Sequence, residues 1–211
     1  MRCIGIYGSS GFGREVAPLV RAQFGGENTD ILFIDDNASN GGSVVTFEEF
    51  TGLPHDEKLV TIAIANSAVR ETLATRCADA GIGIAEVRAS NVLVYDDVEI
   101  GEGAILCGFT HLTSTIRVGR HFHANIYSYV AHDCVIGDYV TFAPGVKCNG
   151  NVHIDDHAYV GTGAIIKQGT PDKPLRIGRG AVIGMGAVVT RDVPAGVTVV
   201  GNPAKPFAPR A

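Results

Sequence analysis

Residues 130–142 read VAHDCVIGDYVTF, and apolar residues occupy the first, seventh and thirteenth positions of this stretch, at Val130, Ile136 and Phe142. The same six-residue spacing continues in both directions along the chain. Its members are Val94, Ile100, Leu106, Leu112, Val118, Ala124, Val130, Ile136, Phe142, Cys148, Ile154, Val160 and Ile166 and, after a five-residue insertion, Ile177, Ile183 and Val189. A hexapeptide period is the sequence signature of a parallel β-helix.

Each six-residue unit predicts one short strand and one corner, with the recurring apolar side chain pointing into the coil. Three units close a triangular coil of about 18 residues, and we expect about five coils. Residues one coil apart should therefore share an edge, separated by roughly 4.8 Å. This period extends from about residue 89 to a short tail that ends at residue 211.

The first part of the chain, residues 1–88, has a different pattern. Short apolar runs alternate with segments of helical character, which predicts a small parallel α/β domain of the Rossmann-like βαβ type. The expected strands are 3–7, 31–34 and 59–64, and the expected helices are 14–23 and 67–80. The fold class is therefore mixed, with an α/β domain followed by a β-helix.

The bulk composition excludes several classes of protein. The net charge of −5 is opposite to that of most nucleic-acid-binding domains. No apolar run reaches the ~20 residues that span a bilayer, and the N-terminus lacks a signal-peptide pattern. The five cysteines show no CxxC spacing, which is typical of reduced thiols in a cytoplasmic protein. We expect a cytoplasmic protein without membrane or nucleic-acid partners.

Three further segments carry a resemblance to a known family. They read GSSGFGRE at 8–15, AHDCVIGD at 131–138 and GNPAKP at 201–206. The repeat resembles the hexapeptide acyltransferases, and the layout of both halves resembles the bacterial sialic acid O-acetyltransferase family. That family includes enzymes that N-acetylate nucleotide-linked amino sugars. The resemblance covers essentially the whole chain and implies a left-handed helix, a homotrimer with sites between subunits, and acetyl-CoA as co-substrate.

Acetyl transfer from a thioester needs a base, a donor to the developing oxyanion, and contact between the two substrates. His132 follows the inward Val130 by two residues and should lie at an outward corner, 18 residues before Gly150. The backbone N–H of Gly150 could then serve the oxyanion, and Asp133 could orient the imidazole. The family motif also places the base at His132 and a thioester-contacting amide at Gly150. A corner histidine in a subunit interface is the alternative.

The N-terminal domain is expected to bind the nucleotide-sugar acceptor. Its glycine-rich turn joins a strand to a helix, an arrangement that presents backbone N–H groups to phosphate. Acidic residues end the second strand and could meet the base or ribose, as in dinucleotide folds. The family implies further contacts after the third strand and at a β-helix asparagine. The expected substrate-binding residues are Gly8, Ser9, Ser10, Gly11, Phe12, Gly13, Asp35, Asp36, Ala65, Asn66, Arg70 and Asn125.

The family places coenzyme A along a groove towards the C-terminal coils. Small residues there could let the pantetheine arm pack on the backbone, and cations could meet its phosphates. The expected cofactor-binding residues are Gly161, Gly163, Ala164, Lys167, Gly184, Ala187 and Lys205, with Arg191 also available. The insertion at 170–174 could cover the pantetheine arm or only extend a corner.

Together these observations predict transfer of an acetyl group from acetyl-CoA to the amino group, at C4, of a nucleotide-linked deoxy amino sugar. The amine should attack directly in a ternary complex. Cys148 is expected to point inward, whereas the position of Cys134 leaves open a role as nucleophile. O-acetylation of a sugar hydroxyl is the main alternative. A metal-dependent β-helix hydratase is a weaker one, because the histidine spacings do not fit a three-histidine zinc site, and no metal is expected.

Overall fold

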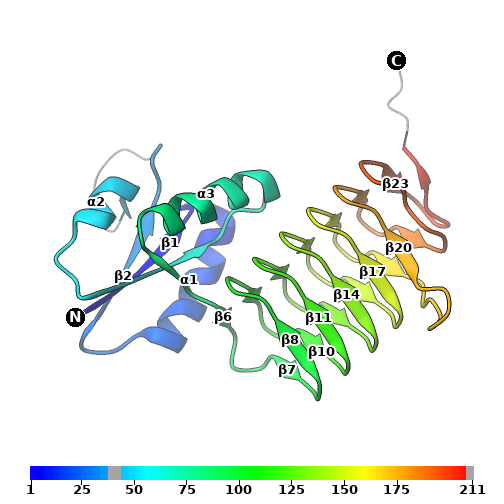
Figure 1. Ribbon diagram of the computed structural model, residues 1–211, viewed down its shortest axis with the longest axis horizontal. Helices are drawn as coiled ribbons and strands as arrows, with labels where there is room; N and C mark the ends of the chain where they lie inside the picture. The colour runs from blue at the N-terminus through cyan, green and yellow to red at the C-terminus, as the bar shows by residue number, and fades with distance from the viewer. Residues whose placement is uncertain (38–43, 208–211) are drawn as a thin grey trace. The chain divides into compact units, whose positions relative to one another are not determined.

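The computed structural model describes residues 1–37 and 44–207, and the chain divides into two compact units, Met1–Ala89 and Ser90–Ala211 (Figure 1). The first unit is an α/β domain and the second is a parallel β-helix, as the two sequence periods predict. In the described part of the chain, no helix combines the length and the apolar character that crossing a bilayer requires.

The first unit is built on a parallel sheet with strand order β3-β2-β1-β4-β5. Its elements are β1 (Arg2–Tyr7), α1 (Gly11–Phe24), β2 (Thr29–Ile34), β3 (Val44–Val45), α2 (Phe47–Gly52), β4 (Glu57–Ile62), α3 (Ser67–Asp79), β5 (Gly83–Ile84) and β6 (Val87–Arg88). The central strand β1 is inaccessible at Ile4 and Ile6, because helices cover both faces of a parallel sheet. Burial of each such side chain stabilises the domain by about 1.5–3 kcal/mol.

The predicted strands and helices of this unit are present, with bounds shifted by a few residues. The expected strand at 59–64 is β4, which begins and ends two residues earlier. The short helix α2 was not predicted, although a capping box marks its start. Thr46 accepts a hydrogen bond from the Glu49 backbone (3.1 Å), and the Glu49 carboxylate accepts one from the Thr46 backbone (2.7 Å).

The strands of the second unit form three parallel sheets. The first sheet contains β7 (Leu93–Val94), β10 (His111–Leu112), β13 (Tyr129–Val130), β16 (Lys147–Cys148), β19 (Ile165–Ile166) and β22 (Val188–Val189). The second contains β8 (Val98–Ile100), β11 (Ile116–Val118), β14 (Cys134–Ile136), β17 (Val152–Ile154) and β20 (Leu175–Ile177). The third contains β9 (Ile105–Leu106), β12 (His123–Ala124), β15 (Thr141–Phe142), β18 (Tyr159–Val160), β21 (Val182–Ile183), β23 (Thr198–Val200) and the antiparallel β24 (Lys205–Pro206).

The strand register confirms the predicted 18-residue coil. Val130 pairs with Leu112 on one side and with Cys148 on the other. At the insertion, Val152 pairs with Leu175. The five extra residues therefore form a loop outside the coil, and the pairing of the strands continues on both sides of it. The inward positions from Leu106 onward form one continuous apolar core. The β-helix is thus held by stacked aliphatic layers and by coil-to-coil backbone hydrogen bonds.

Three rows of corners connect the sheets. The first corner leads from the first sheet to the second, and its residues Asp97, Thr115, Asp133 and Asn151 have positive φ values of 55–58°. This left-handed conformation suits short polar residues such as Asp and Asn. The second corner leads from the second sheet to the third, and the third corner leads back to the first sheet.

The second corner carries a ladder of stacked rings 18 residues apart, formed by His121, Tyr139 and His157. The rings of His121 and Tyr139 stack at 5.2 Å, and those of Tyr139 and His157 at 5.3 Å. His121 and Tyr139 are buried, so the ladder is part of the packed corner.

Candidate active site

The first corner holds His132 and Asp133 between β13 and β14. The imidazole Nδ1 lies 2.6 Å from the Asp133 carboxylate, and each side chain is about half exposed, at 49% and 48%. When Asp133 accepts the hydrogen bond from Nδ1–H, the other ring nitrogen, Nε2, carries the free lone pair. Asp133 has the left-handed backbone conformation that is shared along this row of corners. The pair can therefore act as an oriented base.

Gly150 lies one coil further along the same corner, directly against the imidazole. A Cβ atom at Gly150 would come within 2.6 Å of both Cε1 and Nε2 of His132. The two coils are joined here by the Asn151 backbone N–H, which donates to the His132 carbonyl at 3.0 Å. Within the described part of the chain, the Gly150 N–H has no intramolecular acceptor. The structure therefore brings together all three residues expected at the catalytic centre.

The two thiols near this corner are both inside the β-helix. Cys134 and Cys148 are 1% and 0% exposed, and the Cys134 thiol donates to the Asn149 carbonyl at 3.3 Å. Cys148 is completely buried and is hydrogen-bonded to Cys134. Both effects raise the pKa of the Cys148 thiol well above its usual value. A buried, protonated thiol is inert as a nucleophile. Hydrogen bonding with Cys148 lowers the pKa of Cys134, although burial opposes this. At 1% exposure the Cys134 sulfur is nevertheless shielded from any substrate at the surface.

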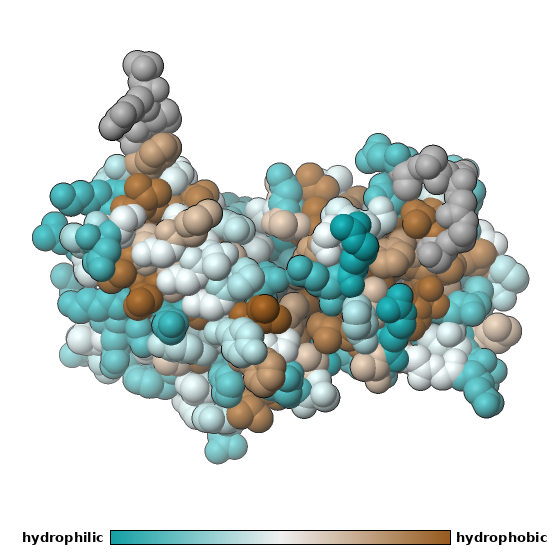
Figure 2. All heavy atoms as spheres, turned by 180° about the vertical axis from the view of Figure 1, so that it is seen from behind, coloured by the Kyte–Doolittle hydropathy of each residue, from teal (hydrophilic) through white to brown (hydrophobic). Residues whose placement is uncertain are grey.

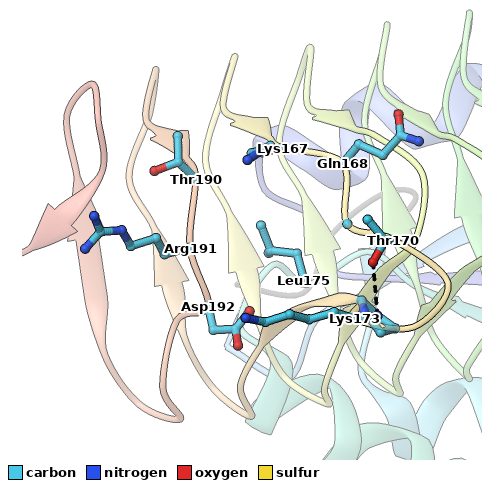
Figure 3. A pocket seen from close by; sticks show the side chains of 10 residues that line it. Lys167, Gln168, Thr170, Lys173, Leu175, Thr190, Arg191 and Asp192 are labelled. Carbon is cyan, nitrogen blue, oxygen red and sulfur yellow. Dashed lines mark hydrogen bonds between the residues drawn. The ribbon is translucent and has the colours of Figure 1, made fainter.

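The first corner continues into a cation-lined pocket formed around the insertion. The Gly169 backbone N–H donates to the Gly150 carbonyl at 3.0 Å, so the pocket begins one coil beyond the catalytic pair. Its volume is about 580 Å³ (Figure 3). It is lined by Lys167, Gln168, Gly169, Thr170, Lys173, Pro174, Leu175, Thr190, Arg191 and Asp192. Of the residues expected to meet the cofactor, Lys167 and Arg191 lie here.

The glycine-rich turn of the first unit follows β1 at the carboxyl edge of the sheet. Gly8 has a φ of 108° and lies close to the Ala63 carbonyl, where a Cβ would come within 3.0 Å. At Gly13 a Cβ would collide with the Gly8 carbonyl, so close packing of turn and helix requires glycine at both positions. Ser10 is the N-cap of α1. The turn presents the N-terminus of α1 to any anion at this edge.

The two acidic residues after β2 have different partners. Asp35 accepts hydrogen bonds from the Ser9 hydroxyl (2.5 Å) and backbone (3.4 Å), and the Ser9 hydroxyl lowers its pKa. Asp36 accepts from the Tyr7 hydroxyl (2.5 Å) and the Phe47 backbone (2.9 Å), and it pairs with Arg76. Burial opposes ionisation of Asp36, but these hydrogen bonds bring its pKa below the usual value.

Both carboxylates accept hydrogen bonds from protein groups, and Asp36 is also in an ion pair. The Asp36 carboxylate is occupied by protein partners, so its expected contact with a base or ribose is replaced by a structural one. The Tyr7–Asp36–Arg76 cluster was not predicted, because its three members come from β1, the β2 end and α3 and share no local motif. Asp35 faces the glycine-rich turn through Ser9.

The expected contacts after β4 also need correction. Arg70 is completely buried and donates to the Ile64 carbonyl at 2.7 Å and the Ala65 carbonyl at 3.3 Å. It fixes the loop from inside and cannot reach a ligand outside. Asn66 is the N-cap of α3 and accepts from the Val69 backbone at 3.0 Å. Ala65 and Asn66 remain exposed at the carboxyl edge of the sheet.

The small residues predicted to contact the cofactor lie on the third corner. Within one chain, this corner is separate from the first corner that carries His132. Ala164 and Ala187 are fully buried in the core, and a Cβ at Gly161 would meet the next coil at Met185. Their small size therefore reflects core and coil packing, which excludes side-chain contact with a ligand in the single chain. Gly163 is exposed, Gly184 is half-buried, and Lys205 is exposed on β24. Asn125 also lies on the third corner and donates to the Phe142 carbonyl at 2.8 Å.

A Rossmann-like domain followed by a hexapeptide β-helix with a histidine at its corner defines a β-helix acyltransferase. Among the described residues, no group of three or more His, Cys, Asp or Glu side chains is placed to hold a metal ion. The family model described as the PglD N-terminal domain matches residues 3–77. A GDP-perosamine N-acetyltransferase of Escherichia coli O157:H7 is 48% identical, covering 97% of this chain and 96% of that protein.

Solved structures give the same result. WeeI from Acinetobacter baumannii AYE is 61% identical with a TM-score of 0.94, covering 98% of this chain and 100% of that one. The acetyltransferase domain of PglB from Neisseria gonorrhoeae FA1090, solved with acetyl coenzyme A, is 28% identical with a TM-score of 0.86, covering 98% and 99%. The chain belongs to the hexapeptide-repeat nucleotide-amino-sugar N-acetyltransferase family, which confirms the predicted resemblance and fold class.

Proposed function

We propose that this protein transfers the acetyl group of acetyl-CoA to the amino group of a nucleotide-linked deoxy amino sugar, at C4, and that GDP-perosamine is its first substrate to test. The observation that carries the proposal is 48% identity to a GDP-perosamine N-acetyltransferase over nearly the whole chain. The first corner supplies matching chemistry in His132, Asp133 and Gly150.

In the proposed mechanism, the sugar amine attacks the thioester carbonyl carbon while Nε2 of His132 takes a proton from the nitrogen. Asp133 stabilises the imidazolium that forms. The carbonyl oxygen becomes an oxyanion that accepts a hydrogen bond from the Gly150 N–H. Collapse of the tetrahedral intermediate forms the amide and releases coenzyme A, whose thiolate takes the proton from His132. Burial of Cys134 and Cys148 supports direct attack without an acyl-enzyme.

The first unit would hold the nucleotide part of the acceptor. The turn at residues 8–13 would cradle the diphosphate with backbone N–H groups and the N-terminus of α1. Asp35 and the exposed residues Ala65 and Asn66 lie at the same carboxyl edge, where ligands bind in open parallel sheets. The five cysteines are all free thiols, which fits a protein of the reducing cytoplasm.

The acetyltransferase is proposed to be a homotrimer with sites between subunits. On the third corner, the rings of Phe109 and Tyr127 stack at 4.8 Å and remain 49% and 61% exposed. Exposed apolar groups of this kind mark protein contacts, and Figure 2 shows apolar side chains between hydrophilic ones on one face. A neighbour's third corner placed against the first corner would bring Asn125 towards His132, which one chain alone does not do.

Coenzyme A release across a panel of nucleotide-linked sugars tests the function. We expect turnover with GDP-perosamine or another nucleotide-linked 4-amino sugar, and its loss in His132→Ala. His153→Ala, a half-buried histidine one coil away on the second sheet, is the matched control. If only sugars with a hydroxyl group in place of the amine are acetylated, the enzyme is an O-acetyltransferase and the proposed N-acetylation is wrong. Full activity in His132→Ala would contradict the mechanism.

A further inference from the structure

The core of the β-helix contains two side chains that are not hydrocarbons. Among the described residues, the members of this core are Ala, Val, Leu, Ile and Phe, except for Cys134 and Cys148. Both sulfur atoms lie near one backbone oxygen, the Asn149 carbonyl, at 3.3 Å from Cys134 and 3.8 Å from Cys148. A carbonyl that points into an apolar core needs a hydrogen-bond donor. The two thiols therefore satisfy the Asn149 carbonyl from inside the coil.

This carbonyl belongs to the same peptide unit as the Gly150 N–H. Among the described residues the cis peptide bond is Asn202–Pro203, so the bond between Asn149 and Gly150 is trans. The C=O and N–H bonds of a planar trans peptide point in opposite directions. Because its carbonyl is held towards the core, the unit directs the Gly150 N–H away from the core.

The Cys134 thiol also contacts the residue that carries the proposed base. Its sulfur lies 3.6 Å from the His132 carbonyl oxygen. One thiol is therefore in contact with the backbone of His132 and with the peptide unit of Gly150. In the preceding coil, Ile116 and Val130 occupy the positions of Cys134 and Cys148, and neither side chain has a donor. The thiol pair is thus placed at the coil that carries the catalytic centre.

The side chain of Asn149 is fixed as well. Its Nδ2 donates to the Ile166 carbonyl at 2.8 Å, and its Oδ1 accepts from the Tyr129 hydroxyl at 2.9 Å. Its backbone N–H donates to the same Ile166 carbonyl at 3.3 Å. With these groups held by neighbouring coils, the thiols of Cys134 and Cys148 control the remaining freedom, which is the rotation of the peptide unit that follows.

We propose that Cys134 is a positioning residue for acetyl transfer: its thiol holds the peptide unit between Asn149 and Gly150 so that the N–H is directed at the developing oxyanion. Cys148 supports the same carbonyl from beside it. The inference rests on the proposed function, in which His132 and Gly150 form the catalytic centre, and it gives the buried thiol pair a role there. A thiol is a weak donor, so the effect is one of orientation, at a distance from the substrate.

Exchange of the thiol tests this role by separating kcat from KM. In Cys134→Ala we expect kcat to fall about 5- to 20-fold, part of the roughly 10²- to 10³-fold that one oxyanion donor supplies, with KM for acetyl-CoA within about twofold. Cys134→Ser keeps a donor at this place and should restore kcat to within about threefold of the wild type. Normal kcat in Cys134→Ala, or a Cys134→Ser enzyme that is equally slow, would overturn the proposal.

Cys107→Ala is the matched control, because it removes a thiol from another buried position of the β-helix. The melting temperature should fall by a similar small amount in Cys107→Ala and Cys134→Ala, whereas kcat should fall only in Cys134→Ala. An equal loss of kcat in both variants would make the effect one of packing and contradict the proposal. Mass spectrometry of enzyme quenched during turnover adds a second check, since an acetyl group on Cys134 would make this residue a nucleophile instead.

Infrared spectroscopy of the bound donor separates this inference from the proposed function. Difference spectra of acetyl-CoA that is isotope-labelled at the carbonyl carbon need no sugar and no turnover. A hydrogen bond from the Gly150 N–H polarises this carbonyl and lowers its stretching frequency. We expect this shift in the wild type and in Cys134→Ser, and its loss in Cys134→Ala. A full shift in Cys134→Ala would overturn the inference and leave the proposed function intact. No shift in the wild type would contradict the oxyanion role of Gly150, and the inference with it.

Discussion

The His132 ring lies so close to Gly150 that it leaves no room for a side chain at residue 150. In Gly150→Ala the new methyl group would lie 2.6 Å from Nε2 and displace the ring. Because an error of about 1 Å in position can lower turnover about 100-fold, we expect kcat to fall by about that factor. Gly26→Ala is the matched control, since nothing lies within 4 Å of that added methyl group. Steady-state kinetics would refute the packing argument if Gly150→Ala retained normal kcat.

The hydrogen bond between His132 and Asp133 makes a separate prediction about the base. Asp133→Asn keeps the shape of the side chain, but it no longer provides a carboxylate to stabilise the imidazolium. We expect kcat to fall at least about tenfold, with KM for acetyl-CoA unchanged because Asp133 is expected to act only through the imidazole. An unaltered pH–rate profile together with wild-type kcat would show that Asp133 only packs against the ring.

Asp36 gives a prediction about stability and pH. Its pKa is lowered in the folded state from the ordinary value of 3.8. Its stabilising effect is therefore present above about pH 4 and is lost as the pH falls through the folded-state pKa. Asp36→Asn should cost about 1 kcal/mol at pH 7, and the difference should shrink on acidification. Denaturant unfolding at pH 7, 5, 4 and 3, with the exposed Asp155→Asn as control, measures this; a difference that grows on acidification would contradict it.

At the scale of elements, the β-helix was predictable because every unit repeats the same apolar requirement. Elements that rest on a single local contact, such as α2 with its capping box, were missed. The position of each residue within its coil explains the differences at the site.

The period alone aligned His132 with Gly150, but it did not show that Ala164 and Ala187 point into the core. The same count extended across the insertion would have placed Arg191 on the His132 edge. The Arg70 contacts are set by loop geometry, which no repeat encodes.

The insertion should be separable from the fold. Deleting residues 170–174 restores the six-residue spacing between Ile166 and Ile177, so the coils can stack without a break. We expect a change in melting temperature of only a few degrees, since surface insertions weigh little on stability. KM for acetyl-CoA should rise at least about tenfold, because the resemblance implies that the insertion covers the pantetheine arm. If the deletion variant no longer unfolds cooperatively, the insertion is required for the β-helix to fold, and the prediction is wrong.

At the scale of the whole molecule, two predicted sets of residues lie on different corners of one chain. His132 and Gly150 are on the first corner, whereas Asn125 is on the third. A cyclic assembly joins unlike surfaces of neighbouring subunits, so it can unite the two corners where a monomer cannot. The proposed approach of Asn125 to His132 could not be derived from one sequence. The repeat specifies which residues share an edge of the coil stack, but it contains no information about which edge meets a neighbouring subunit.

Subunit mixing tests this shared site. His132→Ala and Asn125→Ala should each be impaired alone, because every interface then lacks one partner. In a refolded equimolar mixture, about a quarter of the interfaces would combine an intact His132 with an intact Asn125. Activity should therefore recover to about a quarter of the wild-type value, with trimers seen by analytical ultracentrifugation. Activity that stays at the average of the two separate variants would place Asn125 and His132 in independent roles, because random assembly must otherwise create complete sites.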